Sequence, residues 1–399
     1  MAANDEARVT ELCDQLLTKL DPKSTPSTEF LGAQYDLGLA WVHFPEGFGG
    51  LGLEPQTQRH IESRLREAGA PPPQSMIFFN LYLAAPTMVT HGSDELRKRA
   101  LRPMFTGEEV WCQLFSEPGS GSDLAGLATR AVRDGDEWVV NGQKVWNTLA
   151  HLADRGMLVA RTDAEVPKHK GLTYFMVDMH APGVEVRPLR QITGEAEFNE
   201  VYLTDVRIAD ADRIGDTGDG WRVSMTTLMN ERTTIGSGGG GGPKRGSGSI
   251  AEALYTWKRI DDHSPARRDR LMQLWCDAEV LRLTNMRASA RARAGNPGPE
   301  GSIAKLAFAN LNKSVYEWCI DTMGPAGIVD YDYTFRRPSE AALDGAPGTA
   351  RKFFLRSRAN SIEGGTSEIM RNILGERILG LPGEPRVDRE IPWSQVPRS

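Results

Sequence analysis

The sequence predicts an α+β protein of several domains: an N-terminal helical domain, a middle antiparallel β-barrel or sandwich domain, and a C-terminal antiparallel helical bundle. The first observation behind this prediction is that apolar residues change from helical spacing to short runs between turns, and back again. The second is that 399 residues are many for one core, so two or three packed units are expected. We place the domains at residues 1–109, 110–213 and 214–399.

The first domain is predicted to be helical because apolar residues recur at helical spacing from its start. Pro45 and the glycine-rich stretch at residues 46–52 interrupt this pattern with a loop, since neither residue type suits a helix interior. Helical pattern resumes at residues 56–68 and 96–104. The apolar residues of the first helix are Val9, Leu12, Leu16, Leu17 and Leu20.

The middle domain is predicted to consist of short strands. The pairs Asp134-Gly135 and Asn141-Gly142 are typical of tight hairpin turns, so they predict three short antiparallel strands in a meander. Short strands with turns between them indicate a sandwich or barrel. The strand candidates are residues 137–140, 145–146, 156–160, 172–178 and 200–203.

The last domain is predicted to be a bundle, because long helical patterns alternate with glycine and proline loops. Further helices begin near Ile303 and Ile369. Residues 236–248 are so rich in glycine that no helix is expected to persist there. We interpret them as a disordered insertion in preference to a mobile lid. One helix face carries Leu271, Leu274, Trp275, Ala278, Leu281 and Met286.

Composition excludes several classes of function. A net charge of -6 gives no basic field for nucleic acid, and any anionic ligand must meet local cations or backbone amides. The four cysteines are scattered without metal-site spacing, so no metal is expected and the thiols are predicted to be reduced. The sequence has no apolar signal region and no run long enough to span a bilayer, which predicts a soluble cytoplasmic protein and not a membrane protein.

Two segments of the middle domain have residues suited to a flat polar ligand. In residues 114–123, Leu-Phe-Ser-Glu-Pro-Gly-Ser-Gly-Ser-Asp, small residues around Pro118 force an irregular backbone that can turn its amides toward one anion or ring. The alternative is an ordinary turn. Trp146-Asn147-Thr148 ends a strand, so its indole can stack on a ring beside a donating hydroxyl, or lie in the core.

Two segments of the last domain are candidates for acid–base chemistry and anion binding. Glu231 precedes Arg232 on a helix with apolar neighbours, where a carboxylate can have a raised pKa and take a proton from carbon. The alternative is a solvated helix face. Residues 362–371 pass from a Gly-Gly loop into a helix with Thr366 or Ser367 as its N-cap. Free amides at such a start favour an anion or a flavin carbonyl, and the alternative is simply a capped helix.

In this order the four segments resemble the acyl-CoA dehydrogenase family, over nearly the whole chain. The resemblance implies the three-part fold described above, FAD as cofactor and an acyl-CoA as substrate. It also implies flavin contacts by Phe115, Ser116, Gly121, Ser122, Trp146, Thr148, Thr366 and Glu368. It implies substrate contacts by Ser122, Met229, Arg232 and Gly365.

The resemblance implies that Glu231 is the catalytic base. Many members of the family have a glutamate directly before the Gly-Thr of the terminal loop, but this chain has Gly364 there and Glu363 one residue earlier. Another branch, similar to isovaleryl-CoA and long-chain enzymes, has the base on a helix just before an arginine. Glu231 before Arg232 matches that position.

The function implied is α,β-dehydrogenation of an acyl-CoA by a homodimer or homotetramer that passes electrons to an electron-transfer flavoprotein. Two alternatives remain: a flavin oxidase, and a silent partner subunit in a heteromer. The family's Arg-x-x-Phe-Gly stretch, which holds the flavin pyrophosphate of a neighbouring subunit, is missing near residues 255–262, where Arg259 or Arg267 could substitute. The glycine loop at residues 323–327 is also altered.

Overall fold

The computed structural model describes residues 2–72, 79–238, 244–293, 299–329, 332–339 and 348–397. They form two compact units, each assembled from segments that are distant in the sequence. The predicted domain boundaries stay a prediction. Unit 1 contains Met1–Leu189, Glu197–Thr227 and Val387–Ser399, and unit 2 contains Arg190–Ala196 and Leu228–Arg386.

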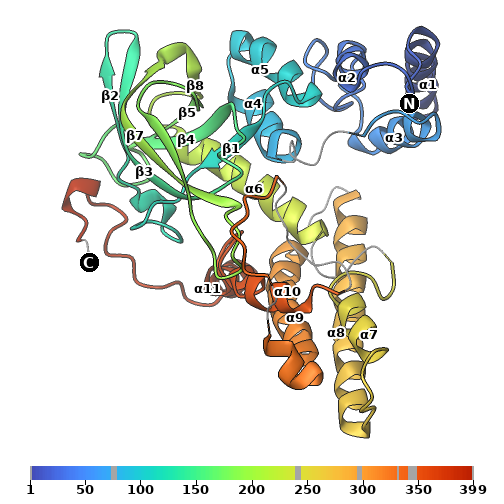
Figure 1. The fold of residues 1–399 in the computed structure, drawn as a ribbon. Coiled ribbons are helices and arrows are strands. Elements are labelled where there is room, and N and C mark those ends of the chain that lie inside the picture. The colour runs from blue at the N-terminus through green and yellow to red at the C-terminus, as the bar shows by residue number, and fades with distance from the viewer. Residues whose placement is uncertain are drawn as a thin grey trace. The chain divides into compact units, whose positions relative to one another are not determined.

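The N-terminal part of unit 1 is helical, as predicted, and appears in blue in Figure 1. Its core contains Val9, Leu16 and Phe30, which are fully buried, so the helical spacing of the apolar residues marks the buried face. Ser93 caps a helix by accepting a hydrogen bond from the amide of Leu96 at 3.2 Å. The helices are α1 Ala2–Lys19, α2 Ser27–Asp36, α3 Gln58–Glu67, α4 Ala85–His91 and α5 Asp94–Thr106, with a π-helical turn at Asn80–Ala84 before α4.

One open eight-stranded sheet forms the β part of unit 1 (Figure 1). The strand order is β6-β7-β3-β2-β4-β5-β8, and β1 pairs with β4. The sheet is mixed and not wholly antiparallel, because β1 and β2 each run parallel to β4. The strands are β1 Trp111–Leu114, β2 Arg130–Asp134, β3 Glu137–Thr148, β4 Arg155–Arg161, β5 Leu172–Asp178, β6 Val184–Pro188, β7 Phe198–Ala209 and β8 Arg213–Ile214.

The predicted turn at Asn141-Gly142 is wrong, whereas the one at Asp134-Gly135 joins β2 to β3 as expected. Strand β3 continues through Asn141 and Gly142 as one long strand. The pairing of β3 with β7 shifts register between Val140 and Gly142, so a bulge absorbs the irregularity. Local turn chemistry was outweighed here by pairing along the full length of β7.

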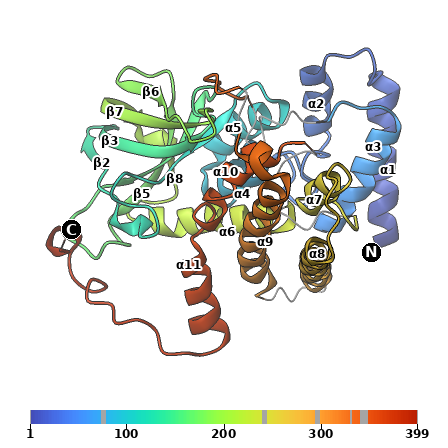
Figure 2. The ribbon, with the colours of Figure 1, turned by 60° about the horizontal axis from the view of Figure 1, so that its bottom comes forward.

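Unit 2 is helical, and its α8 and α9 pack side by side (Figure 2). Leu271, Leu274 and Leu281 of α8 are buried as predicted, but Met286 is 54 % exposed. No helix in the described ranges is long and apolar enough to cross a membrane. The helices are α6 Gly220–Gly238, which begins in unit 1, then α7 Ile250–Trp257, α8 Pro265–Arg293, α9 Glu300–Met323, α10 Ala350–Arg356 and α11 Ser367–Asn372, which continues as a π-helical turn at Ile373–Ile378.

The predicted break at residues 236–248 is only partly tested. Helix α6 continues to Gly238, so the expectation that no helix persists in this stretch is wrong for residues 236–238. Residues 239–243 lie outside the described residues. Residues 244–249 form turns before α7 begins at Ile250.

The C-terminal segment of the chain belongs to unit 1 and lies beside the strands in both views (Figures 1 and 2). The amide of Trp393 donates to the carbonyl of Val166 at 2.9 Å, and the amide of Ser394 donates to Ala164 at 2.9 Å. The indole of Trp393 stacks on the buried guanidinium of Arg161 at 4.2 Å. The segment therefore covers part of the β domain.

Candidate active site

The loop after β1 is a tight turn with an exposed end. Glu117 and Ser120 exchange backbone hydrogen bonds of 2.9 and 3.0 Å, which fold Pro118 and Gly119 into the turn. Phe115 before the turn is buried against Tyr174, with ring centroids 5.7 Å apart. Ser116 is half-buried, while Gly121 and Ser122 are exposed.

A buried ion pair supports this turn from below. The ammonium of Lys144, on β3, lies 2.8 Å from the carboxylate of Glu117 and donates to the carbonyl of Phe115 at 3.0 Å. The same carboxylate accepts hydrogen bonds from the amides of Ala128 and Thr129 at 2.6 and 2.9 Å. Burial raises the pKa of Glu117, but Lys144 and these donors outweigh it and hold that pKa below its ordinary value.

Trp146 presents its indole away from the core. Its backbone has a φ of 62°, at the second register shift of β3, and 57 % of the side chain is exposed. Next to it, Asn147 is buried and donates to the carbonyl of Gln113 at 2.8 Å. Thr148 is half-buried at the end of β3. Bulges commonly re-aim one side chain in this way, so Trp146 is available to a ligand on this face of unit 1.

The terminal loop of unit 2 is held by a dense set of polar contacts. Arg356 donates to both carboxylate oxygens of Glu363 at 3.1 and 2.9 Å, and Asn360 donates to the same carboxylate at 2.6 Å. Thr366 caps α11 by accepting from the amide of Ile369 at 3.1 Å, as predicted for this position. The loop is therefore rigidly placed on its own unit.

Lys305, on α9, joins this loop to the rest of unit 2. Its side chain is buried, and its ammonium donates to the carbonyl of Asn360 at 2.9 Å and to the carbonyl of Gly365. Burial lowers the pKa of Lys305, and the negative charges of Glu363, Glu231 and Glu368 only partly oppose this effect.

The predicted site residues fall into two groups, one on each unit. Six lie on unit 1, around β1 and the end of β3: Phe115, Ser116, Gly121, Ser122, Trp146 and Thr148. The backbone joins the two segments, because the amide of Val145 donates to the carbonyl of Ser116 at 2.9 Å. The others lie on unit 2: Met229, Glu231, Arg232, Gly365, Thr366 and Glu368.

Glu231 lies on helix α6, and it is the last residue of this helix whose side chain the structure describes. Glu231 is half-buried and Met229 is 60 % exposed. Arg232 belongs to α6, but its side chain lies outside the described part of the chain. Glu368 is exposed beside Arg371, at 3.4 Å. The roles predicted for these residues stay predictions.

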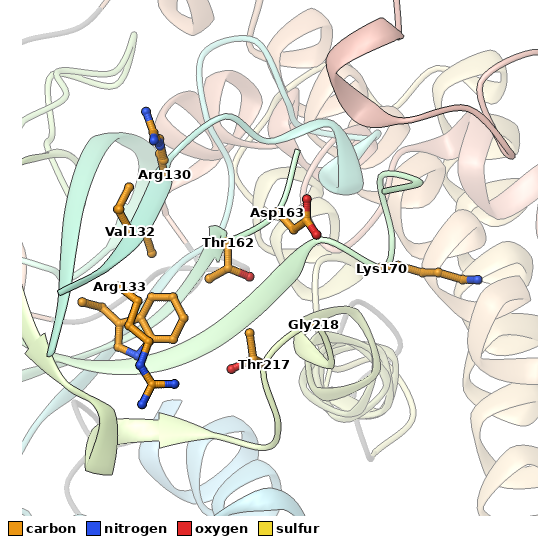
Figure 3. A pocket seen from close by; sticks show the side chains of 10 residues that line it. Arg130, Val132, Arg133, Thr162, Asp163, Lys170, Thr217 and Gly218 are labelled. Atoms are coloured by element: carbon orange, nitrogen blue, oxygen red, sulfur yellow. The ribbon is translucent and has the colours of Figure 1, made fainter. Parts of the chain in front are cut away.

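A pocket of about 400 Å³ lies elsewhere on unit 1 and contains none of the predicted site residues (Figure 3). Its polar lining includes Arg130, Arg133 and Lys170, opposed by Asp163. Arg133 is already engaged, since it donates to the carbonyl of Gly135 at 3.1 Å and lies over the Trp138 ring. Cationic side chains outnumber the one carboxylate, Asp163, in this lining.

Comparison with known proteins identifies the family. Models of the acyl-CoA dehydrogenase N-terminal, middle and C-terminal domains match residues 7–108, 112–206 and 218–379. The chain is 37 % identical to acyl-CoA dehydrogenase IpdE1 of Mycobacterium tuberculosis, covering 88 % of this chain and 86 % of that protein. The chain belongs to the acyl-CoA dehydrogenase family.

Two further relatives describe its place in this family. The chain is 38 % identical to acyl-CoA dehydrogenase FadE34 of Mycobacterium tuberculosis over 87 % of its length, but spans only 45 % of that protein. Among solved structures it resembles the ChsE4-ChsE5 complex from Mycobacterium tuberculosis, with a TM-score of 0.68 and 27 % identity over 96 % of this chain and 98 % of that one. These matches confirm the predicted family and its three-part fold. They also confirm the predicted enzyme class, an acyl-CoA dehydrogenase, and the family's cofactor, FAD.

The residues present fit a flavin. Trp146 offers an exposed aromatic face on a backbone fixed by its neighbours. Within the described ranges, the buried Oδ1 of Asn147 and the buried Oγ of Ser367 have no hydrogen-bond partner. Buried polar atoms without a partner are costly unless a ligand or water satisfies them, so both units carry polar atoms suited to a polar-edged ring.

Sequence reasoning missed the lysines and the arginine that hold these segments. Lys144 stands one residue before Val145-Trp146, and Glu117 stands within the quoted motif, yet neither was given a role. Lys305 and Arg356 lie in helices with no motif around them. The sequence does contain a signal for these residues. A charged residue at a position that the helical or strand spacing assigns to the buried face indicates a buried charge that needs a partner.

Proposed function

We propose that this chain catalyses FAD-dependent α,β-dehydrogenation of an acyl-CoA thioester to the 2-enoyl-CoA, with Glu231 as the catalytic base. The observation that carries this proposal concerns the competing carboxylate, Glu363. Arg356 and Asn360 already bind both of its oxygens, at 2.6 to 3.1 Å. A carboxylate whose two oxygens are already held by its own chain is not free to reach a substrate carbon, which favours Glu231 for the role.

The reaction requires a base and a means of stabilising charge, because the Cα proton of a thioester is only weakly acidic. Glu231 takes the Cα proton and becomes the neutral acid. The electron pair left behind spreads onto the thioester oxygen, which needs hydrogen-bond donors placed in advance. We assign this task to backbone amides of the terminal loop around Gly365. FAD, when bound, would supply the acceptor for the hydride that leaves Cβ as the double bond forms.

Residues of unit 1 are assigned to holding the flavin. Trp146 supplies an exposed ring for stacking, and the half-buried hydroxyls of Ser116 and Thr148 supply hydrogen bonds. Phe115 is fixed against Tyr174 and closes the apolar side. Gly121 and Ser122 are assigned to the region shared by flavin and thioester, where their exposure leaves backbone amides accessible.

Residues of unit 2 are proposed to contact the substrate and part of the flavin. Met229 and Arg232 are proposed to contact the acyl-CoA, and Gly365 to meet the thioester. Thr366 and Glu368 are proposed to contact the flavin. Met229 supports this assignment because 60 % of its apolar side chain is exposed on the helix that carries Glu231.

Replacing Glu231 by glutamine tests the proposed base, because the change keeps the shape and removes the basicity. Anaerobic stopped-flow reduction of the bound flavin by the best acyl-CoA of a panel should slow by about 10²- to 10⁴-fold, the usual contribution of a positioned base. Glu317→Gln is the matched control, since Glu317 is an exposed partner of Arg358 on unit 2. If Glu363→Gln abolished reduction while Glu231→Gln reduced normally, Glu363 would be the base.

The acceptor and the location are proposed from the family resemblance. We propose that the enzyme passes its electrons to an electron-transfer flavoprotein. We also propose that it is a homodimer or homotetramer and that it is located in the cytoplasm. Slow reoxidation of the reduced enzyme by oxygen, with fast reoxidation by an electron-transfer flavoprotein, is the expected result. Rapid reoxidation by oxygen would instead indicate an acyl-CoA oxidase.

A second candidate is a subunit of a heteromeric dehydrogenase, and specific contacts favour it. Arg267 is paired with Asp262 at 2.8 Å, and Arg259 lies over the ring of Tyr255 at 3.8 Å, so both candidates for binding a neighbour's pyrophosphate have partners in their own chain. The similar ChsE4-ChsE5 structure is a complex of two different chains. Purifying the chain alone and measuring flavin per subunit and mass by light scattering separates the candidates. One flavin per chain in a homo-oligomer supports the first.

A further inference from the structure

The motif loop at residues 114–123 is anchored by a lysine at each end. At its start, the buried ion pair of Glu117 with Lys144 fixes the turn. At its end, both carboxylate oxygens of Asp123 accept hydrogen bonds from the ammonium of Lys168, each at 2.9 Å. Lys168 is nearly buried, with 9 % of its side chain exposed. The end of the loop therefore depends on a lysine outside the four segments that resemble the family.

The two residues before Asp123 have few contacts of their own. The hydroxyl of Ser120 donates to the carbonyl of Asp123 at 2.5 Å, so Gly121 and Ser122 lie in a short turn between two fixed residues. Both are exposed, and a Cβ at Gly121 would meet nothing within 4 Å among the described residues. The position of this turn therefore depends on how firmly Ser120 and Asp123 are held.

Lys168 brings a second carboxylate to this place. Asp388 belongs to the C-terminal segment, residues 387–397, and its carboxylate lies 2.5 Å from the same ammonium. Two aspartates repel each other unless a cation lies between them, so Lys168 is needed to bring Asp388 beside Asp123. The hydrogen bond from Lys168 also holds the pKa of Asp388 below its ordinary value. Lys168 thus joins the motif loop to the C-terminal segment.

A second set of contacts joins the C-terminal segment to the residues that follow the loop. The buried guanidinium of Arg161 donates to the carbonyls of Ala125 and Leu127 at 2.6 and 3.1 Å. The ring of Trp393 lies 4.2 Å from this guanidinium, and its indole donates to the carbonyl of Gly126 at 3.2 Å. Three successive carbonyls are therefore bound by Arg161 and Trp393.

We propose that the C-terminal segment positions the motif loop for the flavin, with Lys168 as the positioning residue that joins the two. This inference rests on the proposed function, because it takes Gly121 and Ser122 as flavin contacts. The carboxylates that Lys168 binds are partly exposed, and such ion pairs contribute little to overall stability. The effect of losing them is therefore expected in the loop and in its ligand, more than in the free energy of unfolding.

Asp388→Asn tests the contribution of the segment, because it removes the charge and keeps the shape. Release of FAD from the diluted holoenzyme, followed by flavin fluorescence, should become about 3- to 10-fold faster, the usual effect of weakening one hydrogen bond. Glu390→Gln is the matched control, since it removes the same charge two residues further on. Its carboxylate is 85 % exposed and lies 3.5 Å from Arg389. It should release FAD at the parent rate.

Two variants of Lys168 test the link itself. Lys168→Met removes the ammonium and leaves Asp123 facing Asp388 without a cation, so FAD release should be faster than in Asp388→Asn. Lys168→Arg keeps the charge and the donors, and it should restore release to near the parent rate. If Lys168→Met does not fold, Asp388→Asn and its control decide the matter.

A second measurement needs neither substrate nor flavin reduction. Hydrogen exchange of the backbone amides at residues 120–127 should be faster in Asp388→Asn and in Lys168→Met, because the loop loses an anchor. Val9→Ala separates this effect from a general loss of stability. Val9 is fully buried in the core of the N-terminal helices of the same unit, so the variant lowers the Tm. It should change neither FAD release nor exchange at residues 120–127.

The outcomes distinguish this inference from the proposed function. Parent-like FAD release in Asp388→Asn and Lys168→Met, with or without faster exchange, overturns the positioning role, and slow flavin reduction in Glu231→Gln leaves the dehydrogenase in place. Equally fast FAD release in Val9→Ala also overturns it, since the contacts would then act only through stability. A parent chain that binds no FAD overturns the proposed function and this inference with it. Faster release and exchange in Asp388→Asn and Lys168→Met alone support the inference.

Discussion

At the scale of single residues, the carboxylate of Glu117 and the ammonium of Lys144 show what a buried charge does in this fold. Lys144 is fully buried and lies 2.8 Å from Glu117, which is 8 % exposed. Together they tie the turn after β1 to the strand that presents Trp146. A buried ion pair of this kind fixes the two segments that carry it, because an unpaired charge in the interior would be strongly destabilising.

Replacing Glu117 by glutamine should lower the free energy of unfolding by about 3–5 kcal/mol, because the variant leaves the charge of Lys144 buried without its counter-ion. Urea unfolding followed by fluorescence measures this change. Glu185→Gln is the control and should have little effect, since Glu185 pairs with Arg187 on the exposed surface. Equal losses in the two variants would contradict the importance of burial.

The contribution of Glu117 should also depend on pH. Its pKa is lowered from the ordinary value of 4.5, so its ionised form is favoured in the folded state. The resulting stability is fully present above the unfolded pKa and is lost as the pH falls through the lower, folded pKa. The stability difference between the parent and Glu117→Gln should therefore be constant above about pH 5 and shrink in acid. If the stability difference between the parent and Glu117→Gln grew as the pH fell, the predicted direction of the pH dependence would be wrong.

At the scale of elements, β3 does more than pair with its neighbours. It is irregular at two places, between Val140 and Gly142 and between Lys144 and Asn147. The first lets the strand pass close to Thr129, and the second exposes Trp146. Both irregularities lie within β3, which the sequence predicts as two separate strands.

Gly142→Ala should be destabilising because a Cβ there would lie 2.3 Å from the hydroxyl of Thr129 and 2.8 Å from its Cα. Backbone must move to admit the methyl group, at a cost of about 1–3 kcal/mol. Gly119→Ala is the control, since a Cβ at Gly119 meets nothing within 4 Å. Thermal unfolding of both variants provides the measurement, and an unchanged Tm for Gly142→Ala would contradict the close approach.

At the scale of the whole molecule, the chain builds unit 1 from segments at both of its ends. Lys168 contacts Asp123 at 2.9 Å and Asp388 at 2.5 Å, and so connects the motif loop to the C-terminal segment. The indole of Trp393 donates to the carbonyl of Gly126 at 3.2 Å. Residues more than two hundred positions apart thus stabilise one another.

Trp393→Ala should lower the stability of unit 1 by about 1–3 kcal/mol, from a lost cation–π contact with Arg161 and a lost hydrogen bond. Hydrogen exchange should increase around residues 124–127, while the helices of unit 2 are unaffected. Arg389→Ala is the control, because Arg389 is exposed and pairs only weakly with Glu390 at 3.5 Å. Equal exchange at residues 124–127 in the parent and Trp393→Ala would contradict the prediction.

The sequence by itself determined the family, the succession of helices, strands and helices, and most element positions. Leu172–Asp178 is a strand with the predicted limits, and Thr366 is one of the two residues predicted as the cap. Such features depend on local spacing and on side-chain contacts within one turn, which the order of residues expresses directly. The motif loop at residues 114–123 and the terminal loop were both recognisable for the same reason.

Only the tertiary structure decided which charges meet. Arg356 pairs with Glu363, Lys305 donates to the carbonyls of Asn360 and Gly365, and Lys144 pairs with Glu117. No local sequence pattern relates these partners. It also decided that β3 continues through Asn141-Gly142, because β7 offers it a partner on both sides of that pair. Contacts between residues far apart in the chain depend on packing, and packing is a property of the folded chain as a whole.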